Sequence, residues 1–587
     1  MTFLDDQYHH AIASVATWLA DENTGARELS EHELSVFEGY AAGWMFPFTT
    51  EHTSHLQLLV DREFPYSMPR VFIGGTDEAL SWPHVESGGR LCLAGDGAAI
   101  ATDNPVAVIR HVLNEAHSLI EDNAAGLNTE DYLDDFKAYW RRSLEPNAPQ
   151  LRFHLTHKDS RLVSAWHGKA YCLVAENSHA VHSWMENLTS KTDTRTTYKA
   201  AVISLDSLPL PSHYPCSCRD LRNLVRDHSR DGLNVLDQLL SDEPSVAAVL
   251  LLGKASIGAD VHFGAIIRKP AREQHGHRQG AFPYAKGFRS GKVPATVLAQ
   301  HYKLERSSTV NVDAWKSRIG TSTSTSLEHK KVTIIGCGSL GSSVAQLLAK
   351  SGLGRLHLID SENLGWENIA RHELGAGSVN RNKAFSLAQQ IKAHMPQIRE
   401  CSQAGRRWLE DYTLDNDLFS DSDLVISTTG DWNSDSALSD LCQAGKVACP
   451  VLFGWMEAYA CASHAMAVHE HRGCFRCGFD DVGKQVIPAT LWSSDPTPDG
   501  CGGGTSVYGA IELSQAAAMV AQLAIEVLVA ESCPPVWRTW LAPKQQVYSN
   551  GGLWNPEWTK RFGHPESGAY LTANFLPRKT GCTCSAD

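Results

Sequence analysis

The chain lacks a long apolar run, and it lacks a secretion signal at its N-terminus. Its longest apolar stretch, 516–530, is interrupted by Gln522 and Glu526, whereas a helix that crosses a bilayer needs about 20 predominantly apolar residues. Asp5 and Asp6 stand where a signal peptide would need an apolar segment. We therefore predict a cytoplasmic protein without a membrane span.

The chain also lacks an excess of positive charge, since 52 Lys and Arg stand against 66 Asp and Glu, which gives a net charge of −14. A general nucleic-acid binder normally carries a basic balance, so we predict no nucleic-acid partner. A length of 587 residues with 43% hydrophobic residues predicts three or four domains with sizeable cores. The chain has 15 cysteines, and no secretion leader is recognisable before them. We therefore expect reduced thiols, which favours metal binding or catalysis over disulfides.

Residues 331–335 contain a β-branched run typical of a buried parallel strand, and a G-x-G-x-x-G turn follows at Gly336, Gly338 and Gly341. Such a turn lets the backbone approach phosphate oxygens, while the amides of the following helix supply donors and a positive dipole. A second strand ends in Asp360, at about the 20-residue offset expected of an acid that binds a ribose hydroxyl. The pattern predicts a nucleotide-phosphate site.

Four further polar residues follow this acid, namely Glu362, Asn368, Arg371 and Lys383. The glycine turn alone is equally typical of an NAD or flavin oxidoreductase, but such an enzyme does not need cations and amides beyond the ribose acid. An enzyme that breaks ATP between the α and β phosphates does need them, because Arg and Lys must neutralise the charge that develops on the pyrophosphate. The cluster therefore favours ATP over a dinucleotide.

From about residue 305 onward the chain resembles the adenylating enzymes of the ThiF and MoeB type, which activate ubiquitin and sulfur-carrier proteins. Asp431 follows a strand where this family has its magnesium ligand, and Cys501 precedes an apolar helix where it has its thioester cysteine. The resemblance implies ATP and Mg²⁺ as cofactors and a homodimer. The nucleotide-binding residues that it implies are Gly336, Gly338, Gly341, Asp360, Glu362, Asn368, Arg371, Lys383 and Asp431.

The same resemblance assigns catalytic roles to Arg371 and Lys383, as the cations of the phosphate site. The chain departs from the family at two positions. Ser436 stands where many relatives have an arginine, and Glu362 stands where they have an aspartate.

The N-terminal segment predicts a helix at 4–20, an antiparallel meander, an irregular loop with a cysteine, and a helix capped by Asn104. It resembles ubiquitin-conjugating enzymes, because the turn at 64–69 is similar to their Tyr-Pro-x-x-Pro-Pro and because His84 precedes Cys92 by eight residues. The resemblance makes Cys92 a catalytic thiol and places His84 where the family has an oxyanion-supporting asparagine. An imidazole there either donates to the oxyanion or acts as a base.

The remaining motif cysteines have metal-ligand spacing. Cys474 and Cys477 match the first half of the zinc knuckle of adenylating enzymes, and Cys582 with Cys584 would supply the second half. Four sulfur ligands suit tetrahedral Zn²⁺. The alternative interpretation is four free thiols.

We predict a multidomain α/β chain whose parts follow these resemblances. The predicted domains are a ubiquitin-conjugating-like α+β domain over 1–145, an α/β middle domain over 146–300 and a Rossmann-like adenylation domain over 301–587. Strand-like runs in the middle domain lie at 170–174, 200–205 and 246–252. The basic segment 268–292 either grips a partner protein or forms a solvated loop.

A fusion in this order resembles the ubiquitin-transferase-like proteins of bacterial antiphage CBASS operons. That resemblance implies adenylation of a protein C-terminus, a thioester on Cys501, transfer to Cys92 and then to an amine such as lysine. It further implies a cGAS-like nucleotidyltransferase as the activated partner and a target protein or small amine as the acceptor. Two alternatives stay open: a sulfur-carrier adenylyltransferase, which does not need the Cys92 domain, and a nucleotide-binding scaffold without transfer activity.

Overall fold

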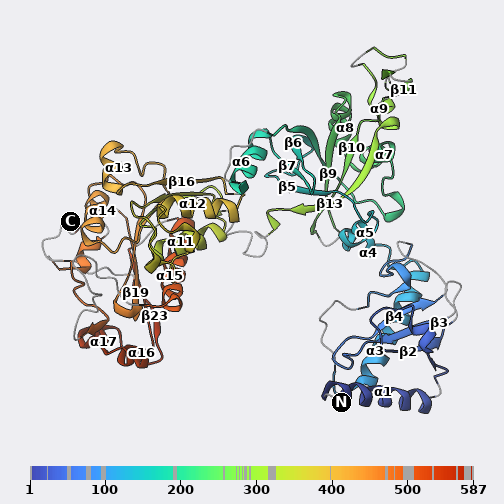
Figure 1. Cartoon of the computed structure of the whole chain (residues 1–587), viewed down its shortest axis with the longest axis horizontal. Coiled ribbons are helices and arrows are strands. Elements are labelled where there is room, and N and C mark those ends of the chain that lie inside the picture. Colours follow the sequence, from blue (N-terminus) through green and yellow to red (C-terminus); the bar gives the residue numbers. More distant parts are fainter. Residues whose placement is uncertain are drawn as a thin grey trace. The chain divides into compact units, whose positions relative to one another are not determined.

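The structure is a computed structural model of the chain, shown in Figure 1. It divides into two compact units, residues 1–181 with 196–311 and residues 182–195 with 312–587, and each unit is described by itself. The structure describes all residues except 1–2, 23, 49–54, 75–80, 94–100, 190–194, 256–257, 273, 276–277, 280–281, 283, 285–286, 290–291, 315–325, 397, 470–472, 481–482, 493–507, 532–534, 564–565, 574–583 and 585–587.

The first unit begins with a four-stranded antiparallel sheet flanked by helices. The strands pair in the order β1-β2-β3-β4. Their bounds are β1 (Arg27–Glu28), β2 (Ala42–Pro47), β3 (His55–Val60) and β4 (Arg70–Gly74). The helices are α1 (Phe3–Asp21), α2 (Glu31–Leu34), α3 (Pro105–Ala124), α4 (Asp131–Asp134) and α5 (Phe136–Arg142).

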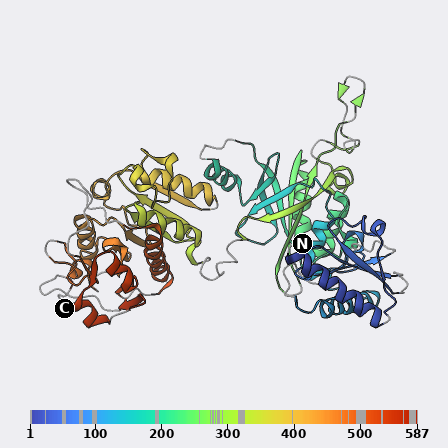
Figure 2. The same ribbon diagram turned by 60° about the horizontal axis from the view of Figure 1, so that its bottom comes forward.

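Helix α3 forms where the sequence predicts it, because the side chain of Asn104 accepts a hydrogen bond from the backbone N–H of Ala107 and a proline opens the first turn. Its apolar stripe, which includes Ile109, Val112 and Ala116, is buried in the core beneath the sheet. Helix α1 packs beside α3, as Figure 2 shows. This arrangement holds the cysteine loop between β4 and α3.

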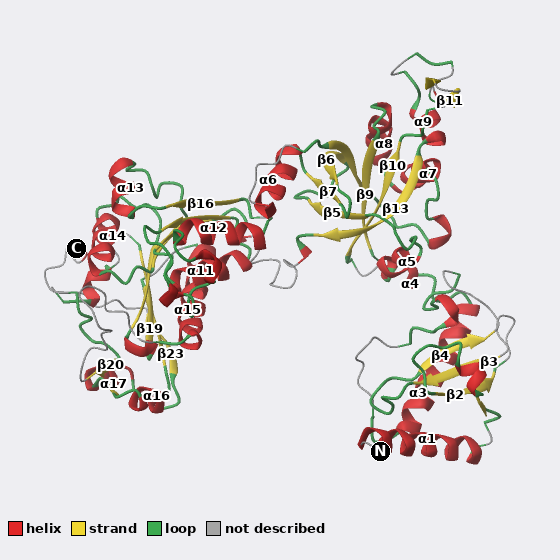
Figure 3. Cartoon of the chain, in the orientation of Figure 1, coloured by secondary structure: helices red, strands yellow, loops and turns green. Residues whose placement is uncertain are grey.

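The rest of the first unit is a closed barrel, which Figure 3 shows in yellow with helices in red on its outside. The strand order is β10-β13-β5-β7-β6-β8-β9. The strands are β5 (Gln150–His154), β6 (Arg161–His167), β7 (Cys172–Ala175), β8 (Tyr198–Ser204), β9 (Val246–Lys254), β10 (Asp260–Arg268) and β13 (Lys303–Asn311). The other elements are α6 (Ser178–Thr189), α7 (Cys218–His228), α8 (Gly232–Ser241), α9 (Ala295–His301), β11 (Gln274–His275) and β12 (Arg278–Gln279).

The apolar run of β8 is explained by burial on both faces. Ala200 and Val202 point into the barrel core, while Ala201 and Ile203 pack in a second core with α7 and α8. The three strand-like runs predicted in the middle region correspond to β7, β8 and β9. The domain boundaries at residues 145 and 300 stay predictions.

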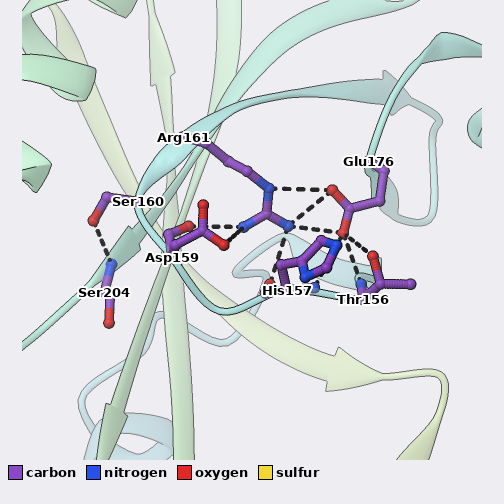
Figure 4. A network of polar contacts seen from close by, with 7 residues as sticks. All are labelled: Thr156, His157, Asp159, Ser160, Arg161, Glu176 and Ser204. Carbon is purple, nitrogen blue, oxygen red and sulfur yellow. Dashed lines mark hydrogen bonds and ion pairs between the residues drawn. The ribbon is translucent and has the colours of Figure 1, made fainter.

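A polar network joins the segments that follow β5 and β7 to the start of β6, and Figure 4 shows it from close by. Both Nε and Nη2 of Arg161 donate to Glu176, with the shortest of these bonds at 2.7 Å, and Nη2 also donates to the backbone oxygen of His157. Glu176 in turn accepts from the backbone N–H and the hydroxyl of Thr156. The arginine side chain hydrogen-bonds within the fold through these groups, so this network is structural.

The second unit contains an eight-stranded sheet in the order β16-β15-β14-β17-β18-β19-β21-β23. The first five strands are parallel and the last three are antiparallel. The strands are β14 (Lys331–Ile335), β15 (Arg355–Ile359), β16 (Glu400–Ala404), β17 (Leu424–Ser427), β18 (Val451–Met456), β19 (Ala462–Val468), β21 (Val536–Leu541) and β23 (Ala569–Ala573). The helices are α11 (Ser339–Lys350), α12 (Lys383–His394), α13 (Trp408–Leu414), α14 (Trp432–Gln443), α15 (Ala510–Val529), α16 (Lys544–Ser549) and α17 (Pro556–Phe562), and a short pair β20 (Thr490–Trp492) and β22 (Gly552–Trp554) completes the unit.

The predicted buried parallel strand is β14, all of whose residues are buried. Its side chains alternate between two cores, with Val332 and Ile334 on the side of α11 and Ile335 on the other. The chain runs from β14 outward to β15 and β16 and then returns to β17, so the strand order reverses at β14. In such sheets ligands bind outside the carboxyl ends of the strands at this reversal.

Helix α15 corrects one prediction. It has 20 residues and is, among the described residues, a helix long and apolar enough to cross a membrane by length and composition. The prediction that this segment is too short was therefore wrong, because the helix begins six residues before the apolar stretch. Half of the apolar window is buried, and residues such as Ala517, Val520 and Ala524 lie in the core that contains α11.

Candidate functional site

A cleft with a volume of about 280 Å³ opens at the carboxyl ends of β14, β15, β16 and β17. It is lined by Ile335, Gly336, Gly338, Ile359, Asp360, Ser361, Glu362, Lys383, Arg406, Arg407, Trp408, Thr428, Thr429, Asp431 and Ser434. Six of the nine residues predicted to bind the nucleotide lie in this set. They come from positions up to 95 residues apart, and the parallel sheet brings them together.

The glycine turn is built so that the backbone approaches itself and the cleft closely. Gly336 has φ of +85°, a conformation that favours glycine. A Cβ atom at Gly341 would lie 1.9 Å from the carbonyl oxygen of Gly336. Gly338 is the N-cap of α11, and a Cβ there would meet no atom within 4 Å. The helix N-terminus is therefore open toward the cleft, as a phosphate site requires.

Asp360 ties the glycine turn to the end of β15. One carboxylate oxygen accepts the N–H of Cys337 at 2.6 Å, and the other accepts the N–H of Glu362 at 2.8 Å. Burial raises the pKa of Asp360, although these bonds oppose the shift. The carboxylate is thus fixed beside the turn, where the predicted bond to a ribose hydroxyl would form.

Two cation–carboxylate pairs cross the cleft. Nζ of Lys383 donates to Oε2 of Glu362 at 2.6 Å, and the lysine side chain is 8% exposed whereas that of Glu362 is 71% exposed. Arg407 lies 3.7 Å from Oδ2 of Asp431, whose Oδ1 accepts the N–H of Asn433 and caps α14. The carboxylate of Asp431 keeps an accessible oxygen, so it suits Mg²⁺, which prefers oxygen ligands.

Arg406 and Arg407 are site residues that were not predicted from the sequence. They follow β16, which reaches the same edge of the sheet as β15. The signal that would have found them is a cationic pair directly after a strand. It was missed because β16 has the sequence Glu-Cys-Ser-Gln-Ala, which carries little apolar pattern.

Of the three predicted residues outside this set, Gly341 belongs to the glycine turn, whereas Asn368 and Arg371 lie apart from the cleft. Asn368 accepts the N–H of Gly365 at 3.0 Å and so holds the loop after β15. Arg371 lies over the ring of Tyr508 at 4.4 Å and lines a second cleft of about 520 Å³. The two clefts share Gly338, Thr428 and Thr429. A ligand in the second cleft would therefore reach the nucleotide site directly.

The second cleft is rich in aromatic side chains and contains a buried acid. Asp435 is 4% exposed and accepts hydrogen bonds from the hydroxyls of Ser427 and Thr429, yet burial raises its pKa to about 6. The aromatic residues lining the cleft are Trp432, Trp455, Phe475, Phe479 and Tyr508. None of these residues was predicted from the sequence to belong to a site.

The predicted metal cysteines are partly brought together. The sulfur atoms of Cys474 and Cys477 are 3.4 Å apart, and that of Cys584 lies 3.5 Å from Cys477. All three side chains are buried and close enough to ligate one ion. Cys582 and the predicted thioester residue Cys501 lie outside the described residues. Three converging thiols suit Zn²⁺, which takes four ligands in structural sites.

In the first unit the loop from His84 to Cys92 folds back on itself. The N–H of Cys92 donates to the carbonyl oxygen of His84 at 2.8 Å, and Val85 bridges Leu91 in antiparallel fashion. The eight-residue spacing is thus the length of a closed loop, with Gly88–Gly89 at positive φ near its tip.

Cys92 is an exposed thiol with a depressed pKa. The largest cause is its contact with the ring of His84, and Arg142 adds to the effect, whereas burial and Glu86 oppose it. Arg142 is held near the thiol by a 2.6 Å ion pair with Glu86. A thiolate is the reactive form of cysteine, so this site favours a nucleophile.

Two family models match the chain. The model of the ThiF family matches residues 313–545, and the model of prokaryotic E2 family B matches residues 42–149. The first match covers the nucleotide cleft and every strand of its sheet except β23, and the second covers the loop with His84 and Cys92.

The chain is also similar to three curated proteins. Uncharacterized protein y4oA of Sinorhizobium fredii is 24% identical over 57% of this chain and 55% of its own length. The ATP-dependent ubiquitin transferase-like protein Cap2 of Vibrio cholerae is 32% identical over 18% of each chain. The adenylyltransferase and sulfurtransferase MOCS3 of Mus musculus is 32% identical over 25% of this chain and 31% of its own. The chain thus matches about half of the first relative and less than a third of the other two.

Proposed function

We propose that this chain activates the C-terminus of a protein with ATP and conjugates that protein to another molecule. The proposal follows from the two family matches, because the chain joins a prokaryotic E2-like region to a ThiF domain. The observation that carries this proposal is the cleft at the carboxyl ends of four strands, where a glycine turn meets three acids and three cations. ATP activation needs donors for the phosphates, cations for the leaving pyrophosphate and oxygen ligands for Mg²⁺.

In the first step, the carboxylate of the partner's C-terminus attacks the α-phosphate of ATP, and pyrophosphate leaves as the acyl-adenylate forms. The amides of the glycine turn hold the phosphates, and Lys383 and Arg407 neutralise the charge on the leaving group. Asp431 would hold Mg²⁺, which adds positive charge at the phosphate oxygens when bound. Arg371, in the adjoining cleft, binds the entering carboxylate.

In the later steps the acyl group passes between thiols. Cys501 displaces AMP and forms a thioester, Cys92 takes the acyl group from Cys501, and an amine such as that of lysine takes it from Cys92 as an amide. Each thioester preserves the activation gained from ATP. Two carriers in one chain raise the effective concentration of the second acceptor.

The name of the Cap2 relatives supports ubiquitin-like transfer, and a more specific version of this proposal rests on the resemblance to the ubiquitin-transferase-like proteins of CBASS operons. In this version the activated protein is a cGAS-like nucleotidyltransferase in antiphage defence, which conjugation primes for activity. The enzyme works in the cytoplasm as a homodimer, and Cys474, Cys477, Cys582 and Cys584 bind a structural Zn²⁺. These points rest on resemblance and on the three converging thiols.

The test is the intact mass of a Cys92→Ser variant purified from cells that also express the genes flanking its own. Serine converts a transient thioester into an ester that survives reductant, so we expect an added mass that reductant does not remove. The size of the added mass identifies the activated protein. The matched control is the same variant with Cys501→Ala, in which we expect no adduct.

ATP–pyrophosphate exchange tests the first step on its own. We expect Lys383→Ala to lower exchange at least about 10²-fold, because a cation that stabilises developing charge is lost. Lys392→Ala, on the same helix α12, serves as the control that retains exchange. No exchange in the unmodified protein, together with no adduct on Cys92→Ser, would leave a nucleotide-binding scaffold.

A sulfur-carrier adenylyltransferase is the second candidate, favoured by the match to MOCS3. It would use the nucleotide cleft and Cys501 but not the E2-like region. Product formation that survives Cys92→Ala at its full rate would select this candidate.

A further inference from the structure

Two carboxylates face the ring of His84. Oδ2 of Asp131 lies 3.1 Å from Nε2, and Oδ2 of Asp135 lies 3.9 Å from Nδ1. The contact with Cys92 raises the pKa of His84 most, Asp131 and Asp135 raise it further, and burial opposes them. Asp131 opens the short helix α4, which lies 39 residues beyond the thiol in the chain.

The backbone of His84 is held in an uncommon conformation. Its φ is +59°, a conformation that is uncommon for a non-glycine residue and persists only where the surroundings impose it. Here its N–H donates to Oη of Tyr139 at 2.7 Å, and its carbonyl accepts from Cys92. Asn123, from α3, donates to the preceding carbonyl of Pro83 at 2.9 Å. These bonds fix the direction in which the ring points.

We propose that Asp131 positions His84 as a general base for Cys92, so that the acyl group carried on Cys92 passes to a hydroxyl group as well as to an amine. A carboxylate bonded to one ring nitrogen sets the tautomer and leaves the other nitrogen to exchange protons. Asp131 lies within hydrogen-bond distance of Nε2, whereas the oxygen of Asp135 nearest to Nδ1 lies 3.9 Å away, beyond that distance, so Nδ1 is the nitrogen that serves the reaction. The inference rests on the proposed function only in taking Cys92 as an acyl carrier.

The ring acts differently in the two halves of the transfer. Before acylation the ring hydrogen-bonds the thiol and lowers its pKa, which favours the thiolate that attacks the incoming thioester. Once Cys92 is acylated, the thiolate charge that favours imidazolium has gone. The pKa of His84 then falls, and the neutral ring becomes available as a base.

The choice of acceptor follows from this base. A free amine attacks a thioester through its own lone pair, whereas an alcohol is a poor nucleophile until a base removes its proton. In the hydroxyl reaction the alcohol oxygen forms a bond to the acyl carbon, and its proton moves to Nδ1 of His84. The carbon–sulfur bond breaks, and the proton then passes to the sulfur of Cys92. The products are an ester and the free thiol.

The test loads Cys92 without ATP. Full-length protein carrying Cys501→Ala is treated with p-nitrophenyl acetate, and acetylation of Cys92 is confirmed by peptide mass. Transfer of the acetyl group is then measured to N-acetylserinamide, which offers a hydroxyl, and to N-acetyl-lysinamide, which offers an amine. We compare the Cys501→Ala parent with the same protein carrying Asp131→Asn. The control is Asp134→Asn, which removes an exposed carboxylate from the same helix.

We expect Asp131→Asn to slow transfer to the hydroxyl about 10²-fold, in the range of general-base catalysis, and to slow transfer to the amine at high pH less than about threefold. The pH midpoint of hydroxyl transfer should move lower, because the carboxylate that raises the pKa of His84 is lost. The other charged or titratable groups near the pair, Asp135, Glu86, Arg142 and Tyr139, are unchanged in this comparison. Asp134→Asn should match the parent.

Three results would overturn the inference: equal slowing with both acceptors, an unmoved midpoint, or no acetylation of Cys92 in the parent protein. None of these results bears on the ATP-dependent steps, because pyrophosphate exchange and the adduct on Cys92→Ser test those steps separately. Conversely, a failure of those two assays leaves the hydroxyl result standing.

Discussion

Two cysteine–histidine pairs in the described part of the first unit behave in opposite ways. Cys92 is exposed, and its contact with His84 lowers the pKa of the thiol. Cys172, in the barrel, has its sulfur 3.7 Å from Nε2 of His167, yet burial raises the pKa of this thiol to about 12 and lowers that of the histidine to about 4. Proximity of the two residue types therefore does not make a nucleophile.

The difference lies in solvent and in charge. Cys172 is 2% exposed, so an ion pair of thiolate and imidazolium would lose the hydration of both charges. Arg268 further disfavours a charged His167, and the opposing effect of Glu305 is smaller. At the other pair, carboxylates stabilise the imidazolium and Arg142 stabilises the thiolate. The charged groups around a cysteine–histidine pair, together with its exposure to solvent, therefore decide whether the pair ionises.

The largest expected effect is the difference in reactivity between the two thiols. With iodoacetamide at pH 7.5, we expect Cys92 in the folded protein to react at least about 10⁴-fold faster than Cys172, because a thiol with a pKa near 12 is almost entirely protonated and this one is also buried. Peptide mass spectrometry over time measures both rates in one sample. Rates within tenfold of each other would break the comparison.

Substitution of each thiol by alanine should separate function from packing. We expect Cys92→Ala to lower conjugate formation at least about 10³-fold, because the acyl carrier is lost. Cys172→Ala should retain conjugation but cost about 1–2 kcal/mol of stability, because it leaves a small cavity in the barrel core. Conjugation assays and thermal melting distinguish the two. A loss of conjugation in a folded Cys172→Ala protein would contradict the assignment.

The sequence was sufficient to predict the adenylation and conjugating regions, and the fusion of the two is confirmed by the family matches. It was sufficient because the defining residues are local: the turn at Gly336 depends on backbone conformation, and the loop to Cys92 closes within eight residues. The Rossmann-like sheet and the helix at Asn104 followed from strand and cap patterns.

Distant pairings could not be predicted from local pattern. The barrel closes through β5 and β13, where Gln150 pairs with Ser308, and no period in the sequence indicates that contact. Asp131 was missed for the same reason, because it reaches His84 only after the chain has folded, whereas Arg407 was missed because β16, the strand before it, carries little apolar pattern. The roles of the individual site residues stay predictions until they are tested.

The half-buried histidine of the barrel pair should also affect stability in a pH-dependent way. His167 has a lowered pKa in the folded protein, so the unfolded chain binds more protons between about pH 4 and 6.5, and stability rises with pH through this window. After allowing for the partial exposure of the ring, we expect about 1–2 kcal/mol. Thermal melting of His167→Gln from pH 4.5 to 7 should show a flatter pH dependence than the wild type. An unchanged slope would remove His167 as its cause.

The smallest expected effect concerns the contribution of the ring of His84 to Cys92. Since the ring contact lowers the pKa of the thiol, the alkylation rate of Cys92 falls as pH drops through that pKa, and His84→Ala should move the midpoint upward. At pH 7 we expect slower alkylation of Cys92 in this variant, and at pH 10 equal rates, because the thiolate fraction depends on the pKa of the thiol only below the midpoint. Cys216, which is also exposed, provides an internal reference in the same digest, and His167→Ala should leave the Cys92 profile unchanged. If His84→Ala instead retains the wild-type rate at pH 7, exposure alone would account for the contrast between the two cysteine–histidine pairs.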